Sequence, residues 1–239
     1  MTSYREIADT IADSILSGRH QPGQRLAPVR DLAQAHGVTT KTAHAAIREL
    51  QARGLVTSHQ GGTMVSARLS VPTPTERLER SLAGVGPLRP GESVRVSSAG
   101  WAEPVPSYVY DVLEVPEGEQ VARREAVTEY DGRKSSLIVS WHPRRIVDLV
   151  PGLIQPEPIL EGTIAAARAA GAAVGQSQNH FMARGADARE AGLLELAEGV
   201  PVMAVVSLRT DREGKPIEYV ECVYRQRCIL STDSRIEDY

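Results

Sequence analysis

The 239-residue chain lacks the features that mark several classes of protein. Its two cysteines, Cys222 and Cys228, lie six residues apart in an apparent strand, and we expect buried small side chains there rather than a disulfide or a metal site. No apolar run approaches the ~20 residues of a membrane span. The N-terminus lacks the basic-then-apolar order of a signal peptide. We therefore predict a cytoplasmic protein with no membrane partner, no cofactor and no metal.

Signals of catalysis are also missing. The sequence contains no Ser/His/Asp order, no Gly-rich phosphate loop and no Cys/His cluster with zinc-like spacing, so we do not expect an enzyme. Charge is present but unevenly divided. Residues 1–70 carry a net charge of +3 and the remainder −6, within a total of −3. A basic module on an acidic body is expected where only the first part touches phosphate.

Residues 4–66 carry the pattern of a winged helix-turn-helix. Apolar periodicity predicts helices over about 4–17, 29–35 and 40–53, with Gly37 in the turn and Thr39 as the N-cap of the third helix. Two short strands, 55–58 and 63–66, would form a wing around the tip at 59–62. This arrangement exists mainly to place one helix in the DNA major groove, so the predicted partner is double-stranded DNA.

The third helix has two faces. Ala43, Ala46, Ile47 and Leu50 form its apolar stripe, which leaves the polar residues on the other side. Threonine hydroxyls and backbone N–H groups at the start of the helix favour binding of a DNA phosphate. Glycines at the wing tip allow the backbone of the wing to approach the DNA closely. The candidate DNA-binding residues are Arg30, Thr39, Thr40, Lys41, Thr42, His44, Arg48, Gln60 and Gly61.

The rest of the chain contains an internal repeat. Residues 113–118 (LEVPEG) match residues 194–199 (LELAEG), and each copy lies between a helix-like stretch and a predicted β-hairpin. Two such units can share one mainly antiparallel sheet, with a natural pocket at the seam between them. We predict an α+β protein with a DNA-binding domain over 1–68, a Pro- and Gly-containing linker over 69–90 that acts as a hinge, and a second domain over 91–239.

Residues 4–66 resemble the N-terminal domain of the GntR family of bacterial transcription regulators. The resemblance is carried by Pro22–Leu26, Arg30–Ala33, Gly37–Thr39, Gly54–Val56 and Gln60–Thr63. It implies DNA contacts through Arg30, the start of the recognition helix and Gly61. The family commonly has Arg at the positions of Thr40 and His44. Threonine cannot make the bidentate contact of arginine to guanine, so the family's usual half-site is not expected here.

Residues 91–236 resemble the UTRA effector-binding domain of the HutC subfamily, which shares the chorismate lyase fold. The resemblance implies that Ser140, His142, Glu218 and Tyr224 lie in an effector pocket. Relatives that bind sugar phosphates carry an Arg-x-Arg pair where this chain has Ala126 and Thr128. A phosphosugar effector is therefore disfavoured. Kinship with a lyase fold does not by itself carry activity.

Two functional hypotheses remain open at this point. The first is a homodimeric repressor whose operator affinity is modulated by a small-molecule effector, since helix-turn-helix operators are two-fold symmetric. The second is a repressor of the type found on conjugative plasmids, in which the pocket is vestigial or takes a ligand other than a sugar phosphate.

Overall fold

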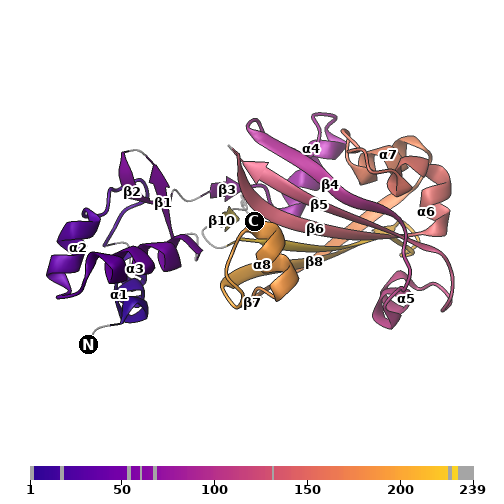
Figure 1. Cartoon of the computed structure of the whole chain (residues 1–239). Coiled ribbons are helices and arrows are strands. Elements are labelled where there is room, and N and C mark those ends of the chain that lie inside the picture. Colours follow the sequence, from indigo (N-terminus) through magenta and orange to yellow (C-terminus); the bar gives the residue numbers. More distant parts are fainter. Residues whose placement is uncertain are drawn as a thin grey trace, which may run out of the picture. The chain divides into compact units, whose positions relative to one another are not determined.

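The structure is a computed structural model that describes residues 3–16, 19–52, 55–59, 61–66, 69–130, 132–225 and 228–230. The chain divides into two compact units (Figure 1). The first comprises Met1–Leu69 with Ala186–Val200, and the second comprises Ser70–Gly185 with Pro201–Tyr239. Within the described ranges, no helix combines the length and the apolar character needed to cross a bilayer.

The first unit begins with three helices and a two-stranded wing. The helices are α1 (Tyr4–Leu16), α2 (Val29–Ala35) and α3 (Thr40–Ala52), and the wing strands are β1 (Val56–His59) and β2 (Gly62–Val65). The predicted winged helix-turn-helix is therefore confirmed, with boundaries that differ by one or two residues. Gly37 has a φ of 63°, the left-handed conformation expected for the turn between α2 and α3.

One apolar core holds these helices together. Ile7, Ile11 and Ile15 of α1 pack with Ile47 and Leu50 of α3, and all five side chains are buried. Their spacing of three or four residues places them on one face of each helix. The N-terminus of α1 is closed by a capping box, in which Ser3 and Glu6 each bind the other's backbone N–H.

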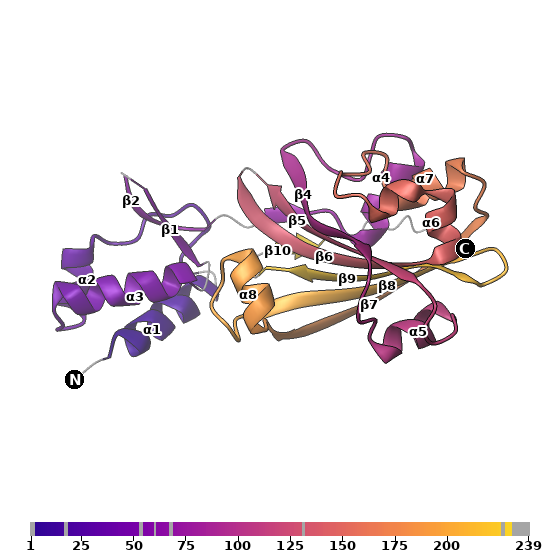
Figure 2. The same cartoon turned by 45° about the vertical axis from the view of Figure 1, so that its right-hand side comes forward.

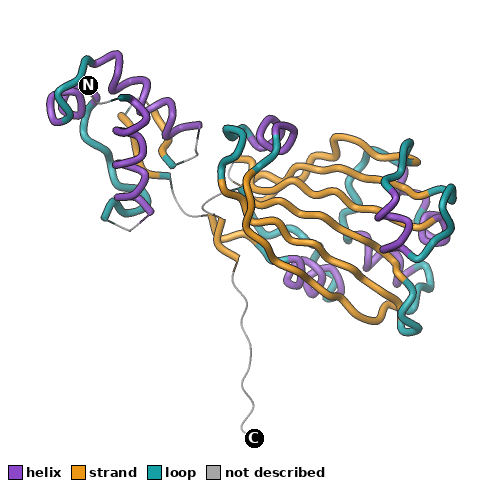
Figure 3. Tube along the Cα trace, turned by 90° about the horizontal axis from the view of Figure 1, so that it is seen from below, coloured by secondary structure: helices purple, strands orange, loops and turns teal. Residues whose placement is uncertain are grey.

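A six-stranded sheet dominates the second unit. Its strands, in the order in which they pair, are β4 (Glu92–Trp101), β5 (Val121–Tyr130), β6 (Arg133–Pro143), β9 (Pro216–Tyr224), β8 (Pro201–Asp211) and β7 (Val174–Gly185). Every neighbouring pair is antiparallel. Figure 3 shows the strands running side by side across the sheet.

The strand order confirms the internal repeat. The first copy is β4, helix α5 (Ser107–Leu113), β5 and β6; the second is β7, helix α8 (Ala188–Leu194), β8 and β9. Each helix ends at a glutamate in the left-handed conformation, Glu114 with φ 52° and Glu195 with φ 55°. The copies meet where β6 pairs with β9, so the sheet order reads the same from either edge.

Helices cover the two faces of this sheet (Figure 2). On one face lie α4 (Pro74–Leu82), α6 (Arg144–Leu149), a short 3-10 helix (Pro151–Ile154) and α7 (Thr163–Ala169), packed around a cluster that includes Ala122 and Leu153. Helix α5 packs on the opposite face against Trp141 and Tyr219.

Residues 69–90 differ from the predicted linker. They contain β3 (Leu69–Val71), which pairs with β10 (Cys228–Leu230), and then α4. Thr73 caps α4 by accepting a hydrogen bond from the N–H of Glu76, and Pro74 occupies the first turn. From Ser70 onward this stretch belongs to the second unit, because the apolar side of α4 packs against that unit's core.

Candidate functional site

Helix α3 presents a polar face to solvent. Lys41, His44 and Arg48 are exposed, and the spacing of three and four residues aligns them along one side of the helix. Thr40 is also exposed at the start of the same face. The apolar stripe predicted opposite them is confirmed, because Ala43, Ala46, Ile47 and Leu50 are all buried. Arg30, in the first turn of α2, is exposed as well.

Two of the candidate threonines shape the start of α3. The Thr39 hydroxyl accepts a hydrogen bond from the Thr42 N–H at 3.2 Å, which confirms Thr39 as the N-cap. The two hydroxyl oxygens lie 3.0 Å apart and share a second hydrogen bond. These contacts fix the first turn of the helix, in which Thr40 and Lys41 are exposed.

The wing brings an arginine to the glycine tip. Arg25 forms a bridge with Met64, and the adjacent Leu26 N–H donates to the Thr63 carbonyl at 2.8 Å. A Cβ atom added at Gly62 would lie 2.8 Å from Arg25 Nε, so the guanidinium rests directly against this glycine. Gly61 beside it is exposed, whereas Gln60 falls outside the described residues.

Arg25 is therefore a further candidate for DNA contact that the sequence pattern alone does not indicate. The residue was visible only as part of the Pro22–Leu26 motif. Its position on the wing depends on backbone pairing between segments far apart in the sequence, which no local pattern reveals.

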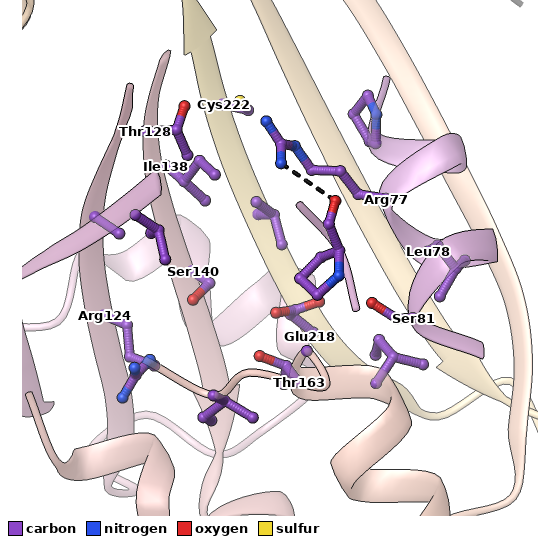
Figure 4. Close-up of a pocket in the computed structure, with 18 of the residues that line it drawn as sticks. Arg77, Leu78, Ser81, Arg124, Thr128, Ile138, Ser140, Thr163, Glu218 and Cys222 are labelled. Carbon is purple, nitrogen blue, oxygen red and sulfur yellow. Dashed lines mark hydrogen bonds between the residues drawn. The ribbon is translucent and has the colours of Figure 1, made fainter. Parts of the chain in front are cut away.

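The second unit contains a cavity of about 180 Å³ on the sheet face covered by α4 and α7 (Figure 4). Ile138 and Ser140 of β6 lie in its floor beside Val220 and Cys222 of β9. These residues are cross-strand partners, Ile138 with Cys222 and Ser140 with Val220. The cavity thus straddles the seam between the two repeats, as predicted.

Three of the four candidate effector residues line this cavity. Ser140, Glu218 and Tyr224 contribute to its wall, but His142 does not. His142 is fully buried behind the wall, with Nε2 3.0 Å from Ser140 Oγ and 3.7 Å from Glu218 Oε1. Serine and carboxylate thus approach the same ring nitrogen. A catalytic triad places them on opposite nitrogens, so this trio has the wrong geometry for one.

Burial sets the protonation of His142. Loss of hydration on burial is the main cause that lowers the pKa of His142 to about 4. The Glu218 carboxylate raises the pKa and offsets part of this effect, whereas the nearby cations Arg124 and Arg209 lower it further. The imidazole is therefore neutral near pH 7. The charged partner of Glu218 is Arg209, with which it forms a buried ion pair.

Both cysteines have free thiols. Cys222 is buried in the cavity floor, where burial raises the pKa of its thiol. Cys228 lies in β10.

Comparison with known proteins places both units in a family. Residues 3–65 match the bacterial regulatory proteins of the gntR family, and residues 93–227 match the UTRA domain. The uncharacterized HTH-type transcriptional regulator RB1450 of Rhizobium meliloti is 31% identical over 221 residues, which cover 90% of this chain and 88% of that protein. The chain belongs to the GntR family. Its UTRA domain assigns it to the HutC subfamily of these transcription regulators.

Other matches span the same two domains of this GntR regulator. The uncharacterized HTH-type transcriptional regulator SCO4628 of Streptomyces coelicolor is 28% identical over 259 residues, covering 98% of this chain and 93% of that protein. The crystal structure of PhnF from Mycobacterium smegmatis has a TM-score of 0.57 at 19% identity, covering 97% and 100% of the two chains. This structural likeness supports the α+β fold. The family is one of transcription regulators and not of enzymes.

Proposed function

We propose that this GntR regulator is a dimeric, sequence-specific repressor whose operator affinity changes when a small molecule occupies the cavity. The proposed DNA contacts are the exposed residues of α3, together with Arg30, Arg25 and the wing tip. Symmetric operators pair with symmetric proteins, which supports a dimer. Phosphate contacts would position the protein, and the α3 side chains would read the bases.

The observation that carries the effector proposal is the dual role of α4. Pro74, Arg77, Leu78 and Ser81 of this helix line the cavity. The same helix begins only five residues after Leu69, where the N-terminal segment of the first unit ends. A ligand can change DNA affinity only by binding two arrangements of the protein unequally. A ligand that touches α4 is in direct contact with the segment that leads out of the DNA-binding unit.

Selection of binding sites from random DNA, repeated with and without small molecules, tests this function. We expect one recurring inverted repeat, bound by two copies of the chain, and a ligand that changes its affinity. Light scattering of the free and DNA-bound protein measures the copy number. A monomer that binds single half-sites with full affinity would contradict the dimer.

A second candidate function is a repressor of the conjugative-plasmid type, in which the pocket is vestigial or takes a ligand other than a sugar phosphate. The observation that favours it is that Ala126 and Thr128 line the cavity. The resemblance to regulators that bind sugar phosphates implies two arginines at these positions. Isothermal titration with a metabolite library separates the two functions. Binding that shifts operator affinity supports the first function, and operator affinity that no bound metabolite alters supports the second.

A further inference from the structure

We propose that the cavity takes a compact, uncharged and mainly apolar molecule with one or two hydrogen-bonding oxygens at one end, such as an alcohol, a phenol or a lactone. This inference rests on the proposed function, in which the cavity is the effector site. The inference goes beyond the proposed function because it names the chemical class of the ligand. Four features of the cavity carry it: size, lining, the state of its arginines, and the position of its hydroxyl groups.

Size and lining favour a small apolar body. A cavity of about 180 Å³ is close to the ~150 Å³ apolar cavity that holds a single benzene ring. Aliphatic side chains and prolines make up most of the wall, and burial of an apolar ligand against them is favourable. From the sheet come Val94, Val96, Ala126, Ile138 and Val220, and from the covering segments come Leu78, Leu88, Pro158, Ile159 and Ile164.

Arg124 already donates most of its hydrogen bonds to the protein itself. It lies on the sheet face that lines the cavity, two residues before Ala126 on β5, so it is the guanidinium nearest in sequence to the missing pair. Its two terminal nitrogens instead donate four hydrogen bonds of 2.6–2.9 Å to backbone carbonyls, those of Gly152, Leu153, Gln155 and Glu157. These bonds fasten the loop around the 3-10 helix to the sheet.

The other two arginines of the cavity already have carboxylate partners. Arg77 donates to Glu92 at 2.9 Å, and the Glu92 side chain is fully buried. Arg209 pairs with Glu218, which itself lines the cavity. These pairs offset much of the positive charge that an anionic ligand would meet, and the Glu218 carboxylate would repel it. Both effects disfavour a phosphate ester.

Three of the cavity's hydroxyl groups and one carboxylate gather at one end of the cavity. Figure 4 shows Ser81 of α4, Thr163 of α7 and Glu218 of β9 converging there, with Ser140 alongside. Ser140 already exchanges a hydrogen bond with the buried His142. Such groups suit an oxygen that donates or accepts a hydrogen bond, and their clustering orients the ligand.

Titration of the full chain with matched probes tests the ligand class. Benzyl alcohol and benzoate share a ring and differ mainly in charge, and glucose 6-phosphate represents the phosphate esters. Ligand-observed NMR and calorimetry measure the affinities. We expect benzyl alcohol to bind at least about tenfold more tightly than either anion, a difference of ~1.4 kcal/mol.

Two variants tie the binding to the cavity. Val220→Phe fills the floor and should weaken benzyl alcohol binding about tenfold or more. Val85→Phe makes the same change at a residue that is 63% exposed and outside the cavity lining, and should leave the affinity unchanged. The fluorescence of Trp101 and Trp141 verifies that the second unit of each variant is folded. If Val220→Phe fails to fold, Ala126→Phe replaces it.

The outcomes separate this inference from the proposed function. Tighter binding of glucose 6-phosphate or benzoate, or no binding of benzyl alcohol at millimolar concentration, overturns the ligand class. If glucose 6-phosphate binds and shifts operator affinity, the ligand class is wrong while the proposed function stands. If benzyl alcohol binds in the cavity and no neutral ligand of this class changes operator affinity, the proposed function is wrong while the ligand class stands.

Discussion

Acidification should destabilise the second unit through His142. The side chain is completely buried, and burial lowers its pKa to about 4, whereas the unfolded chain should titrate near the ordinary value of 6.5. Between pH 6.5 and 4 the His142 imidazole therefore binds a proton in the unfolded state but stays neutral in the folded state. The free energy of unfolding falls as the pH drops from 6.5 to 4 and is insensitive to this group outside that window.

The size of the effect follows from the two pKa values. Over the whole window the loss is about 3 kcal/mol, because each pKa unit corresponds to ~1.4 kcal/mol. Between pH 7 and pH 5 the contribution of His142 alone is about 2 kcal/mol. That is a large fraction of the stability of an ordinary domain.

Urea unfolding of the full chain measures this effect. Both tryptophans, Trp101 and Trp141, belong to the second unit, so their fluorescence reports its unfolding selectively. The matched control is His142→Gln, which keeps a hydrogen-bonding side chain next to Ser140 but cannot titrate. We expect the wild type to lose about 2 kcal/mol more than the variant between pH 7 and pH 5. An equal decrease in the free energy of unfolding in the wild type and the variant would show that His142 is not a buried neutral imidazole.

Three further predictions concern DNA binding. Arg30→Ala should weaken binding to selected and scrambled duplexes alike and lower the slope of log affinity against log salt by about one, as gel shifts at several salt concentrations measure; a loss confined to the selected site would count against a phosphate contact. His44→Ala should change the preference at one base position in a randomised operator, and an unchanged preference would remove it from base readout. Gly62→Ala strains a residue at φ 111° and displaces Arg25, so it should weaken DNA binding about as much as Arg25→Ala, with helix content unchanged in circular dichroism; intact binding by both variants would exclude Arg25 from the interface.

The winged helix-turn-helix could be predicted because its signals are local. Helix periodicity, the Thr39 cap and the Gly37 turn each lie within a few residues of the element they define. The repeat could be predicted for the same reason, since the chain reverses at Glu114 and at Glu195 in the same conformation. Element types are set by short-range spacing, whereas their packing partners are not.

The helix α4 was missed for a reason that the sequence could have corrected. Prolines and glycines on either side of it indicate a linker. Thr73, Pro74 and Glu76 nevertheless form a start signal for a helix, in which the Thr73 hydroxyl caps the Glu76 N–H. Composition favours a linker here and the capping signal favours a helix, and the structure follows the capping signal.

The details of the cavity lie beyond sequence reasoning. Ser140 and His142 are two residues apart on one strand and were predicted to share a pocket. His142 pairs with Ala122, which packs against Ile146 and Leu153, so the covering helices bury that end of the strand. The sequence also cannot tell whether Arg124 is free or occupied. In the structure Arg124 donates hydrogen bonds to four carbonyl oxygens of a loop that is distant in the sequence.

The most direct test of the central claim is the affinity of the full chain for a duplex selected from random DNA, compared with a scrambled duplex at the same salt concentration. Fluorescence anisotropy measures both. A sequence-specific regulator should bind the selected duplex at least ~10³-fold more tightly. Equal affinities, or a selection that returns no recurring sequence, would contradict the account.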